Sequence, residues 1–171
     1  MTSKMSVNNL KANLTNPART YLWDVVIANP IGGGDTETLM LRAQSTSIPG
    51  RSQGQIAVPY KQSAGIEFPG KLAYDHTWDV TFVEGEDRKI FDSIYAWLQN
   101  VVHDVDNVGL GDPGVKSDIL LQLITTKGEE WMRIKLIGCY PLRVGSVDMS
   151  YNNESIVNFS VTWSFDSWVR V

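Results

Sequence analysis

The sequence predicts a mainly β protein, α+β in class. We expect an antiparallel β-sandwich or open barrel of about eight strands, with one flanking α-helix and a long extended hairpin loop. Apolar and polar residues alternate with the period of a strand in several segments, most clearly at 76–83 and 155–168. One segment, residues 86–101, has helical spacing instead. Between residues 48 and 70, prolines and glycines interrupt short strand-like pieces.

The chain has 171 residues, a length that fits a single domain with a sizeable core. Residues 1–16 are polar and lead into Pro17, which predicts a flexible N-terminal arm. Residues 17–171 are therefore expected to form one domain.

The predicted strands cover most of that domain. In the last strand, alternation places five apolar side chains on the inner face: Val157, Phe159, Val161, Trp163 and Phe165. A tight turn at Lys127-Gly128 joins two central strands. The other predicted strands span residues 19–29, 38–47, 76–83, 118–126, 130–140 and 143–150.

The proline-rich stretch from residue 48 to 70 keeps strand-like pieces at 55–60 and 65–68. Proline lacks an amide hydrogen and is confined to sheet edges or to segments outside a sheet. We therefore expect a long hairpin that leaves the body of the fold.

The single predicted helix starts at Glu86-Asp87, where acidic side chains favour the positive end of the helix dipole. One apolar stripe follows at helical spacing, and we expect it to pack on the sheet: Ile90, Phe91, Ile94, Trp97, Leu98 and Val101.

Charge and composition exclude several classes of protein. The formal net charge is −4 and the basic residues are scattered, which argues against a surface that grips nucleic acid. No run approaches the about 20 apolar residues of a membrane helix, and residues 1–16 do not resemble a signal peptide, so we expect no membrane partner. Cys139 is the only cysteine; it excludes an intrachain disulfide and is expected to be buried and inert.

No catalytic or metal-binding constellation emerges from the sequence. His76 and His103 are expected to have structural roles, and Gly32–Gly34 lacks the Lys-Ser/Thr of a phosphate-binding loop. Asp104 and Asp106 imitate the start of a calcium loop, but Val115 stands at its closing position. We expect no enzyme activity and no cofactor.

The order of short motifs along residues 16–168 resembles the tail tube protein family of contractile-tailed bacteriophages. No single motif is diagnostic; their order over the whole chain carries the resemblance. The matching segments are Asn16–Arg19 before Tyr21–Ile27, Arg42–Gly50, Phe68–Lys71 before Tyr74–Phe82, Ile94–Trp97, Ile137–Pro141, Val144-Gly145, and Tyr151–Glu154 before Val157–Asp166.

The resemblance implies the tail-tube fold and a structural subunit that forms hexameric rings, stacked into a tube for DNA passage during ejection. It implies as partners further copies of the chain, the tail sheath, a baseplate initiator, a tape measure and a tail terminator. DNA would pass through the lumen without specific binding. The expected location is the virion tail, assembled in the bacterial cytoplasm.

Candidate site residues follow from that role. Inter-ring contacts are predicted at Pro49, Arg51, Gln53, Tyr60 and Lys61. The lumen is predicted to be neutral to negative, with Arg42, Gln44, Thr46 and Gln55 facing it, although these are equally well ordinary solvent-facing positions. Helix residues predicted to face the sheath are Asp87, Arg88, Asp92 and Gln99.

Two other readings remain open from the sequence. In the first reading, within the same superfamily, the chain would be a baseplate tube initiator or an injection-system tube protein related to the hemolysin-coregulated family. In another class, it is a ligand-binding β-sandwich that uses exposed aromatic residues such as Tyr60 and Tyr74. The second reading predicts a monomer with saturable ligand binding.

Overall fold

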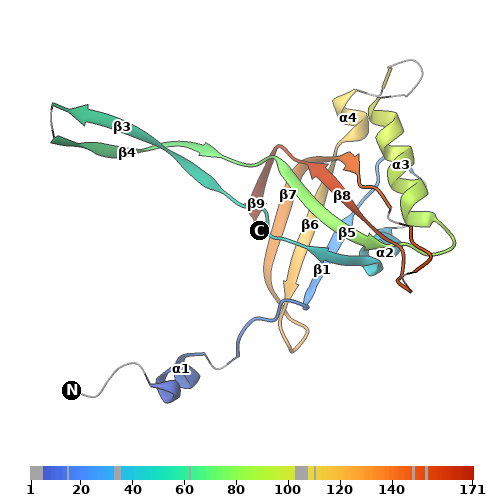
Figure 1. Cartoon of the computed structure of the whole chain (residues 1–171), viewed down its shortest axis with the longest axis horizontal. Coiled ribbons are helices and arrows are strands. Elements are labelled where there is room, and N and C mark those ends of the chain that lie inside the picture. The colour runs from blue at the N-terminus through green and yellow to red at the C-terminus, as the bar shows by residue number, and fades with distance from the viewer. Residues whose placement is uncertain are drawn as a thin grey trace.

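The structure, a computed structural model, describes residues 6–14, 16–32, 36–61, 63–102, 108–109, 111–147, 149–152 and 154–171. Within these ranges the chain forms nine strands and four helices (Figure 1). The strands are β1 (Trp23–Ile27), β2 (Ala43–Thr46), β3 (Ser52–Tyr60), β4 (Ser63–Ala73), β5 (Thr77–Val83), β6 (Ser117–Ile124), β7 (Glu130–Val144), β8 (Asn158–Ser164) and β9 (Ser167–Arg170). The helices are α1 (Val7–Asn13), α2 (Thr36–Leu41), α3 (Lys89–Val101) and α4 (Asp112–Val115).

Seven antiparallel strands form the body, and the long strand β7 belongs to two sheets. Its first part pairs with β6 on one side and with β9 on the other. Its last part, from Tyr140 to Val144, pairs with β8. The first sheet is therefore β1-β6-β7-β9, and the second sheet is β7-β8-β5-β2. A bulge between Pro141 and Arg143 marks the second part of β7.

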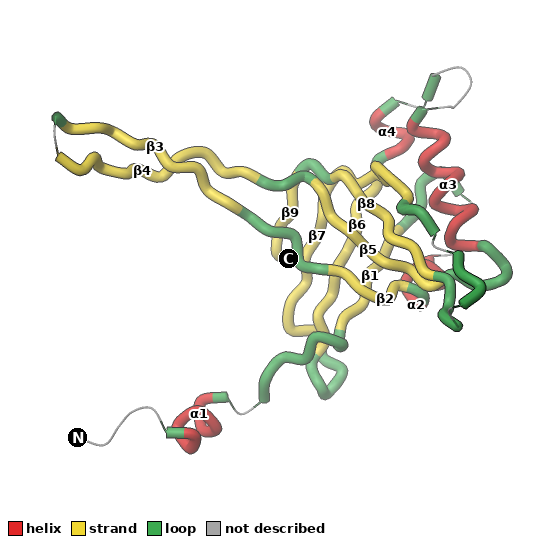
Figure 2. The backbone as a smooth tube through the Cα atoms, in the orientation of Figure 1, coloured by secondary structure: helices red, strands yellow, loops and turns green. Residues whose placement is uncertain are grey.

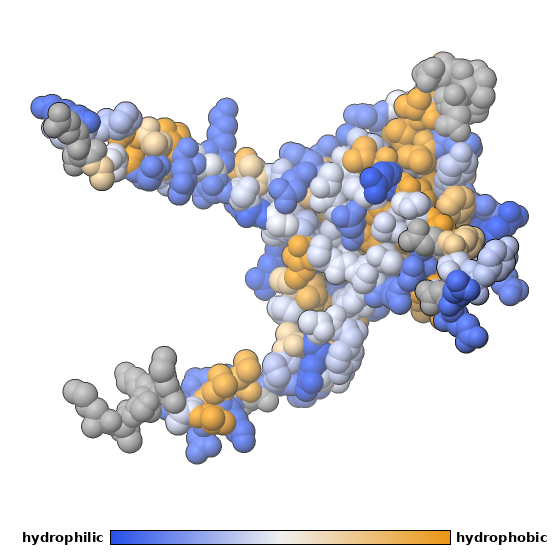
Figure 3. Space-filling model, viewed as in Figure 1, coloured by the Kyte–Doolittle hydropathy of each residue, from blue (hydrophilic) through white to orange (hydrophobic). Residues whose placement is uncertain are grey.

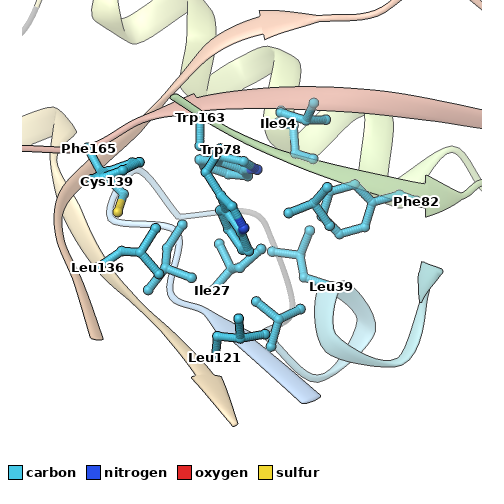
Figure 4. Packing of buried hydrophobic residues seen from close by; sticks show 14 of the residues in the cluster. Ile27, Leu39, Trp78, Phe82, Ile94, Leu121, Leu136, Cys139, Trp163 and Phe165 are labelled. Carbon is cyan, nitrogen blue, oxygen red and sulfur yellow. The ribbon is translucent and has the colours of Figure 1, made fainter. Parts of the chain in front are cut away.

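The core lies between the two sheets and is built by strict alternation. On β5, Trp78, Val80 and Phe82 are at most 2% exposed, and the side chains between them point outward. Figure 4 shows side chains of both sheets and of α2 and α3 pointing toward one another. The other buried strand residues are Val25, Ile27, Ile119, Leu121, Ile134, Leu136, Cys139, Pro141, Phe159, Val161 and Trp163.

Helix α3 lies on the flank of the sandwich (Figure 2). Its apolar stripe packs into the core. Ile90, Ile94 and Trp97 are at most 1% exposed. The Trp97 ring meets Trp163 of β8 edge-on at 5.2 Å between centroids. Its indole Nε1 donates a hydrogen bond of 2.6 Å to the Val115 carbonyl, which fixes α4 against α3. The predicted helix and its stripe are confirmed.

The helix begins three residues later than the sequence indicates. Glu84, at the end of β5, accepts hydrogen bonds from the amides of Gly85 (2.9 Å) and Phe91 (2.6 Å). This carboxylate satisfies a free amide of the first turn, so Glu86 and Asp87 remain in the loop before it.

The predicted hairpin is confirmed and reaches further than expected, to Ala73. Strands β3 and β4 form a separate two-stranded sheet that projects from the body (Figures 1 and 2). The strands cross closely at Gly54 and Gly70. A Cβ built on Gly70 would lie 2.7 Å from the Gly54 carbonyl carbon, so the crossing requires glycine.

Two predicted strands are wrong. The first half of the strand expected at 38–47 is helix α2, which turns Leu39 into the core. Short apolar runs do not distinguish strand from helix by periodicity. The strand expected at 143–150 is absent from the described residues, because β7 continues to Val144 and residues 145–147 are irregular.

Other boundaries also differ from expectation. The last strand is split into β8 and β9, because the amide of Asp166 bonds to the Ile137 carbonyl (2.9 Å) and carries the chain from the second sheet to the first. Helix α4 lies between α3 and β6, where no helix was predicted, and the arm at 1–16 contains α1. Residues 33–35 and 103–107, including His103, Asp104 and Asp106, lie outside the described residues.

Candidate assembly surfaces

The hairpin carries the largest group of uncovered apolar side chains in the described strands. Every residue of β3 is exposed. In the β3–β4 register Ile56 pairs with Phe68, and Val58 pairs with Ile66. Because paired residues share a face of a two-stranded sheet, these four side chains form one apolar face, between 46% and 59% exposed (Figure 3). We call these four residues the apolar hairpin face.

The opposite face of the hairpin carries Gln55 and Glu67 beside Pro69 and Ala57, and we call it the polar face. Gln55 pairs with Pro69, and Ala57 pairs with Glu67. The ribbon is therefore amphipathic, although no element of the described chain covers its apolar side. An isolated two-stranded hairpin is marginally stable in water. Burial of the apolar hairpin face against a partner would supply the missing stabilisation.

Aromatic residues anchor the base of the hairpin to the body. The indole of Trp78 donates to the Ser47 carbonyl at 2.7 Å, just before β3. After β4, the Tyr74 ring meets Trp168 edge-on at 6.3 Å. His76, with φ of 55°, has its Nδ1 3.0 Å from the Phe165 carbonyl oxygen. These contacts fix the direction in which the hairpin leaves the body and give His76 a structural role, as expected.

The residues predicted to contact a neighbouring ring have different environments. Arg51, Gln53, Tyr60 and Lys61 are exposed on the hairpin or at its base. Pro49 is buried within the subunit, so it has no free surface for a neighbour, and we withdraw it from the prediction. The four apolar-face residues were not singled out from the sequence, because their common face depends on the cross-strand register.

The residues predicted to face the lumen do not lie together. Gln44 and Thr46 lie on β2, the edge strand of the second sheet, where the Thr46 hydroxyl donates to the Asp79 carbonyl (2.9 Å). Gln55 lies on the polar face of the hairpin. Arg42 lies at the end of α2 and is bound to Asp87.

Arg42 and Asp87 form a bidentate ion pair beside the start of α3. Both guanidinium nitrogens lie 2.7 Å from the two carboxylate oxygens. These hydrogen bonds hold the pKa of Asp87 at about 2 and raise the pKa of Arg42. Because the two side chains touch, they share one surface. A lumen-facing Arg42 and a sheath-facing Asp87 are therefore mutually exclusive.

The other residues predicted to face the sheath lie on or before α3. Arg88 has left-handed backbone geometry (φ 52°) and is exposed, as is Asp92 in the first turn. Gln99 is half-buried near the end of the helix. Arg88 and Asp92 are thus available to a partner on the flank of the body.

The described residues contain no cluster of three or more His, Cys, Asp or Glu that could hold a metal ion. Cys139 is fully buried, and its burial raises the thiol pKa to about 12. Two open grooves of the body hold about 240 and 220 Å³, and a third on the hairpin, between Gln53 and Pro69, holds about 310 Å³. All three are near or below about 300 Å³, the lower end of the range for ligand pockets. Tyr74, suggested as an exposed ligand-binding aromatic, is engaged with Trp168 instead.

No helix in the described ranges is both long and apolar enough to cross a bilayer. An antiparallel body with open sheet edges and a projecting amphipathic hairpin is typical of a protein that assembles with other chains. The family model described as phage tail tube protein matches residues 5–171, and the chain belongs to that family. It is a structural tail tube protein and not an enzyme. A search of curated proteins by sequence finds no match.

Solved structures share the fold. One is a chain of the PVC sheath-tube complex of an extracellular contractile injection system, with a TM-score of 0.62, 18% identity and 98% of each chain covered. The anti-feeding prophage cap (AFP tube terminating cap) matches with a TM-score of 0.66, 15% identity and 91% of each chain. The SPP1 tail tube matches with a TM-score of 0.50, 12% identity, 90% of this chain and 78% of that chain. The predicted fold class and family are confirmed.

Proposed function

We propose that the chain is the inner-tube subunit of a contractile phage tail, forming hexameric rings that stack around a channel for DNA passage. The observation that carries the proposal is the amphipathic hairpin. Its apolar face has four half-exposed side chains. Because the hairpin projects from the body, the body does not cover this face. In a member of a tube protein family, such an exposed apolar face is best explained by contact with another copy of the chain.

Ring closure would use the open sheet edges of the body. The second sheet ends at β2 on one side and at the last part of β7 on the other. These two edges differ. Pairing of β2 in one copy with the last part of β7 in the next copy would be a head-to-tail contact, and repeated head-to-tail contacts can close into a ring. Six copies of a four-stranded sheet together supply more strands than the barrels of about 16–18 strands that already enclose a water-filled channel.

Stacking would use the hairpin, with the apolar face against the adjacent ring and Arg51, Gln53, Tyr60 and Lys61 at its margins. Helix α1 is a second candidate contact, because Val7, Leu10 and Leu14 are more than half exposed and the helix buries no residue. Both elements gain apolar burial only through a neighbour.

The exposed residues of α3 would contact a surrounding sheath. Further partners in this role are a baseplate initiator, a tape measure and a tail terminator at the two ends of the tube. The particle would be a virion tail, assembled in the bacterial cytoplasm.

Matched single substitutions on the two hairpin faces test the proposal. Val58 is on the apolar face and Ala57 is its neighbour on the polar face, opposite Glu67. We expect Val58→Lys to abolish tubes in negative-stain micrographs and Ala57→Lys to keep them, with circular dichroism unchanged in both. A charge at an already exposed site leaves the subunit folded but makes burial against a neighbour costly.

The wild-type chain must first form rings or tubes in the same micrographs. Dispersed small particles at all concentrations would favour the monomeric ligand-binding reading and refute the proposal. Normal tubes from Val58→Lys would show that the hairpin is not the stacking element.

A further inference from the structure

Helix α1 has an apolar side that no part of the described chain covers. Val7, Leu10 and Leu14 follow a spacing of three and four residues, which brings side chains onto one side of a helix. Their exposed fractions are 68%, 62% and 54%, and α1 buries no residue. We call these three residues the α1 stripe. The opposite side of the helix is polar and includes the exposed Asn8.

Both α1 and the hairpin are too small to be stable alone. Helix α1 has seven residues, and isolated helices shorter than about 12–15 residues are marginal in water. The Ser6 hydroxyl accepts a hydrogen bond of 3.2 Å from the Asn9 amide, which caps the first turn but buries no apolar surface. A two-stranded hairpin is also marginal unless it packs against a helix or a further strand. Each element therefore needs a partner of the kind that the other provides.

The α1 stripe and the apolar hairpin face match in size. From Val7 to Leu14 the stripe runs about 10 Å along the helix, at 1.5 Å per residue. The two cross-strand pairs of the apolar hairpin face are two residues apart on each strand, or about 7 Å along the ribbon. With their side chains they cover the length of about two helical turns. One helix lying along the ribbon is therefore enough to cover the apolar hairpin face.

The structure places the two elements apart within one copy. The N-terminal arm joins the body beside the turn between β6 and β7, where Asn16 Nδ2 donates to the Thr126 hydroxyl at 3.1 Å. The hairpin leaves further along β7, where Tyr74 meets Trp168 and Trp168 pairs with Leu136. Figure 1 shows α1 and the β3–β4 ribbon projecting separately from the body. In this arrangement contact between them requires two copies. Such a contact joins different surfaces, so it is head-to-tail and repeats along a stack.

We infer that α1 of one copy packs its stripe on the apolar hairpin face of a copy in the adjacent ring; the inference rests on the proposed tube function. The contact completes a layer of one helix on one two-stranded sheet, to which each ring contributes one part. It buries apolar side chains of both segments that the single subunit leaves in water. Because both segments project from the body, they can meet without any change in the core.

Opposite charges placed on the two surfaces test this pairing. Leu10→Glu charges the α1 stripe, and Val58→Lys charges the apolar hairpin face. Each variant alone should give less than about a tenth of the wild-type amount of sedimented tube, because the charge is buried against an apolar partner. In an equimolar mixture, copies of the two variants can alternate, so that each contact joins two unchanged surfaces or a glutamate to a lysine. We expect the mixture to recover at least about half of the wild-type amount.

Two controls carry matched charges. Asn8→Glu lies on the polar side of α1 and should change the amount of tube by less than about twofold. A mixture of Leu10→Lys with Val58→Lys should form no tubes, because alternation then brings like charges together. Equal recovery in both mixtures, recovery in neither, or normal tubes from Leu10→Glu alone would overturn the inference. Absence of tubes from the wild-type chain would instead refute the proposed function.

Discussion

The ion pair between Arg42 and Asp87 joins the end of α2 to the loop before α3. Glu84 lies 3.4 Å from the same guanidinium and also accepts hydrogen bonds from the Gly85 and Phe91 amides. One arginine thereby organises the acidic residues at the start of the helix. Arg42 therefore has a structural role inside the subunit.

The Asp87 pKa provides a direct test of this pair. It lies at about 2, below its ordinary 3.8, mainly because Arg42 donates hydrogen bonds to the carboxylate. The pair therefore stabilises the fold fully above pH 3.8, and the contribution is lost as pH falls through about 2. In Arg42→Ala, we expect carbon-detected NMR titration to show the Asp87 pKa rising toward 3.8.

Lys89→Ala is the control for that titration. Its ammonium lies 3.8 Å from Asp87 Oδ2 and contributes less, so the pKa should change less than in Arg42→Ala. The non-assembling Val58→Lys background keeps the sample small enough for NMR. An Asp87 pKa unaffected by loss of Arg42 would contradict the bidentate geometry.

Cys139 supports a second prediction at the residue scale. Its thiol is fully buried and its pKa is raised to about 12, chiefly because burial disfavours the thiolate. A thiol reagent at pH 8 should therefore leave the native chain unmodified and label it stoichiometrically in guanidinium chloride. Rapid labelling of the folded chain would show that the junction of the two sheets opens readily.

At the scale of elements, Trp97 is the largest of the buried side chains that hold α3. Its ring is fully buried against Trp163, and its Nε1 satisfies the Val115 carbonyl of α4. We expect Trp97→Ala to lower the free energy of unfolding by about 3–5 kcal/mol, because it leaves a large cavity and an unpaired carbonyl. Asp92→Ala on the exposed side should change it by less than about 0.5 kcal/mol. Urea unfolding measures both.

Sequence patterns located the elements that alternate or repeat over many residues. The strand at Thr77–Val83, the apolar stripe of α3 and the hairpin were all predictable, because each has a long, regular period or a dense set of prolines and glycines. Helix α2 was missed because its six residues, Thr36–Leu41, span less than two turns.

Surfaces were harder to predict than elements, for a physical reason. Ile56 and Phe68 belong to one apolar face only once β3 and β4 are paired. The burial of Pro49 depends on packing at the base of the hairpin, which no local pattern encodes.

At the scale of the whole molecule, the body and the hairpin have separate roles. The body holds the core, whereas β3 and β4 pair only with each other and bury none of the described side chains. Their attachment is confined to the base, where Trp168 Nε1 lies 3.4 Å from the Gly50 carbonyl and Trp78 bonds to Ser47. Folding of the body should therefore not depend on the hairpin, while assembly should.

Excision of the hairpin separates folding from assembly. Gln53 and Leu72 are paired across the two strands, so an Asn-Gly turn can replace the residues between them, Gly54–Lys71. We expect the shortened chain to unfold within about 4 °C of the wild-type subunit, since no core contact is lost. Sedimentation should show a monomer that forms no tubes. A large loss of thermal stability would show that the hairpin is part of the folding unit, and tubes of normal appearance would show that stacking relies on α1 or the body.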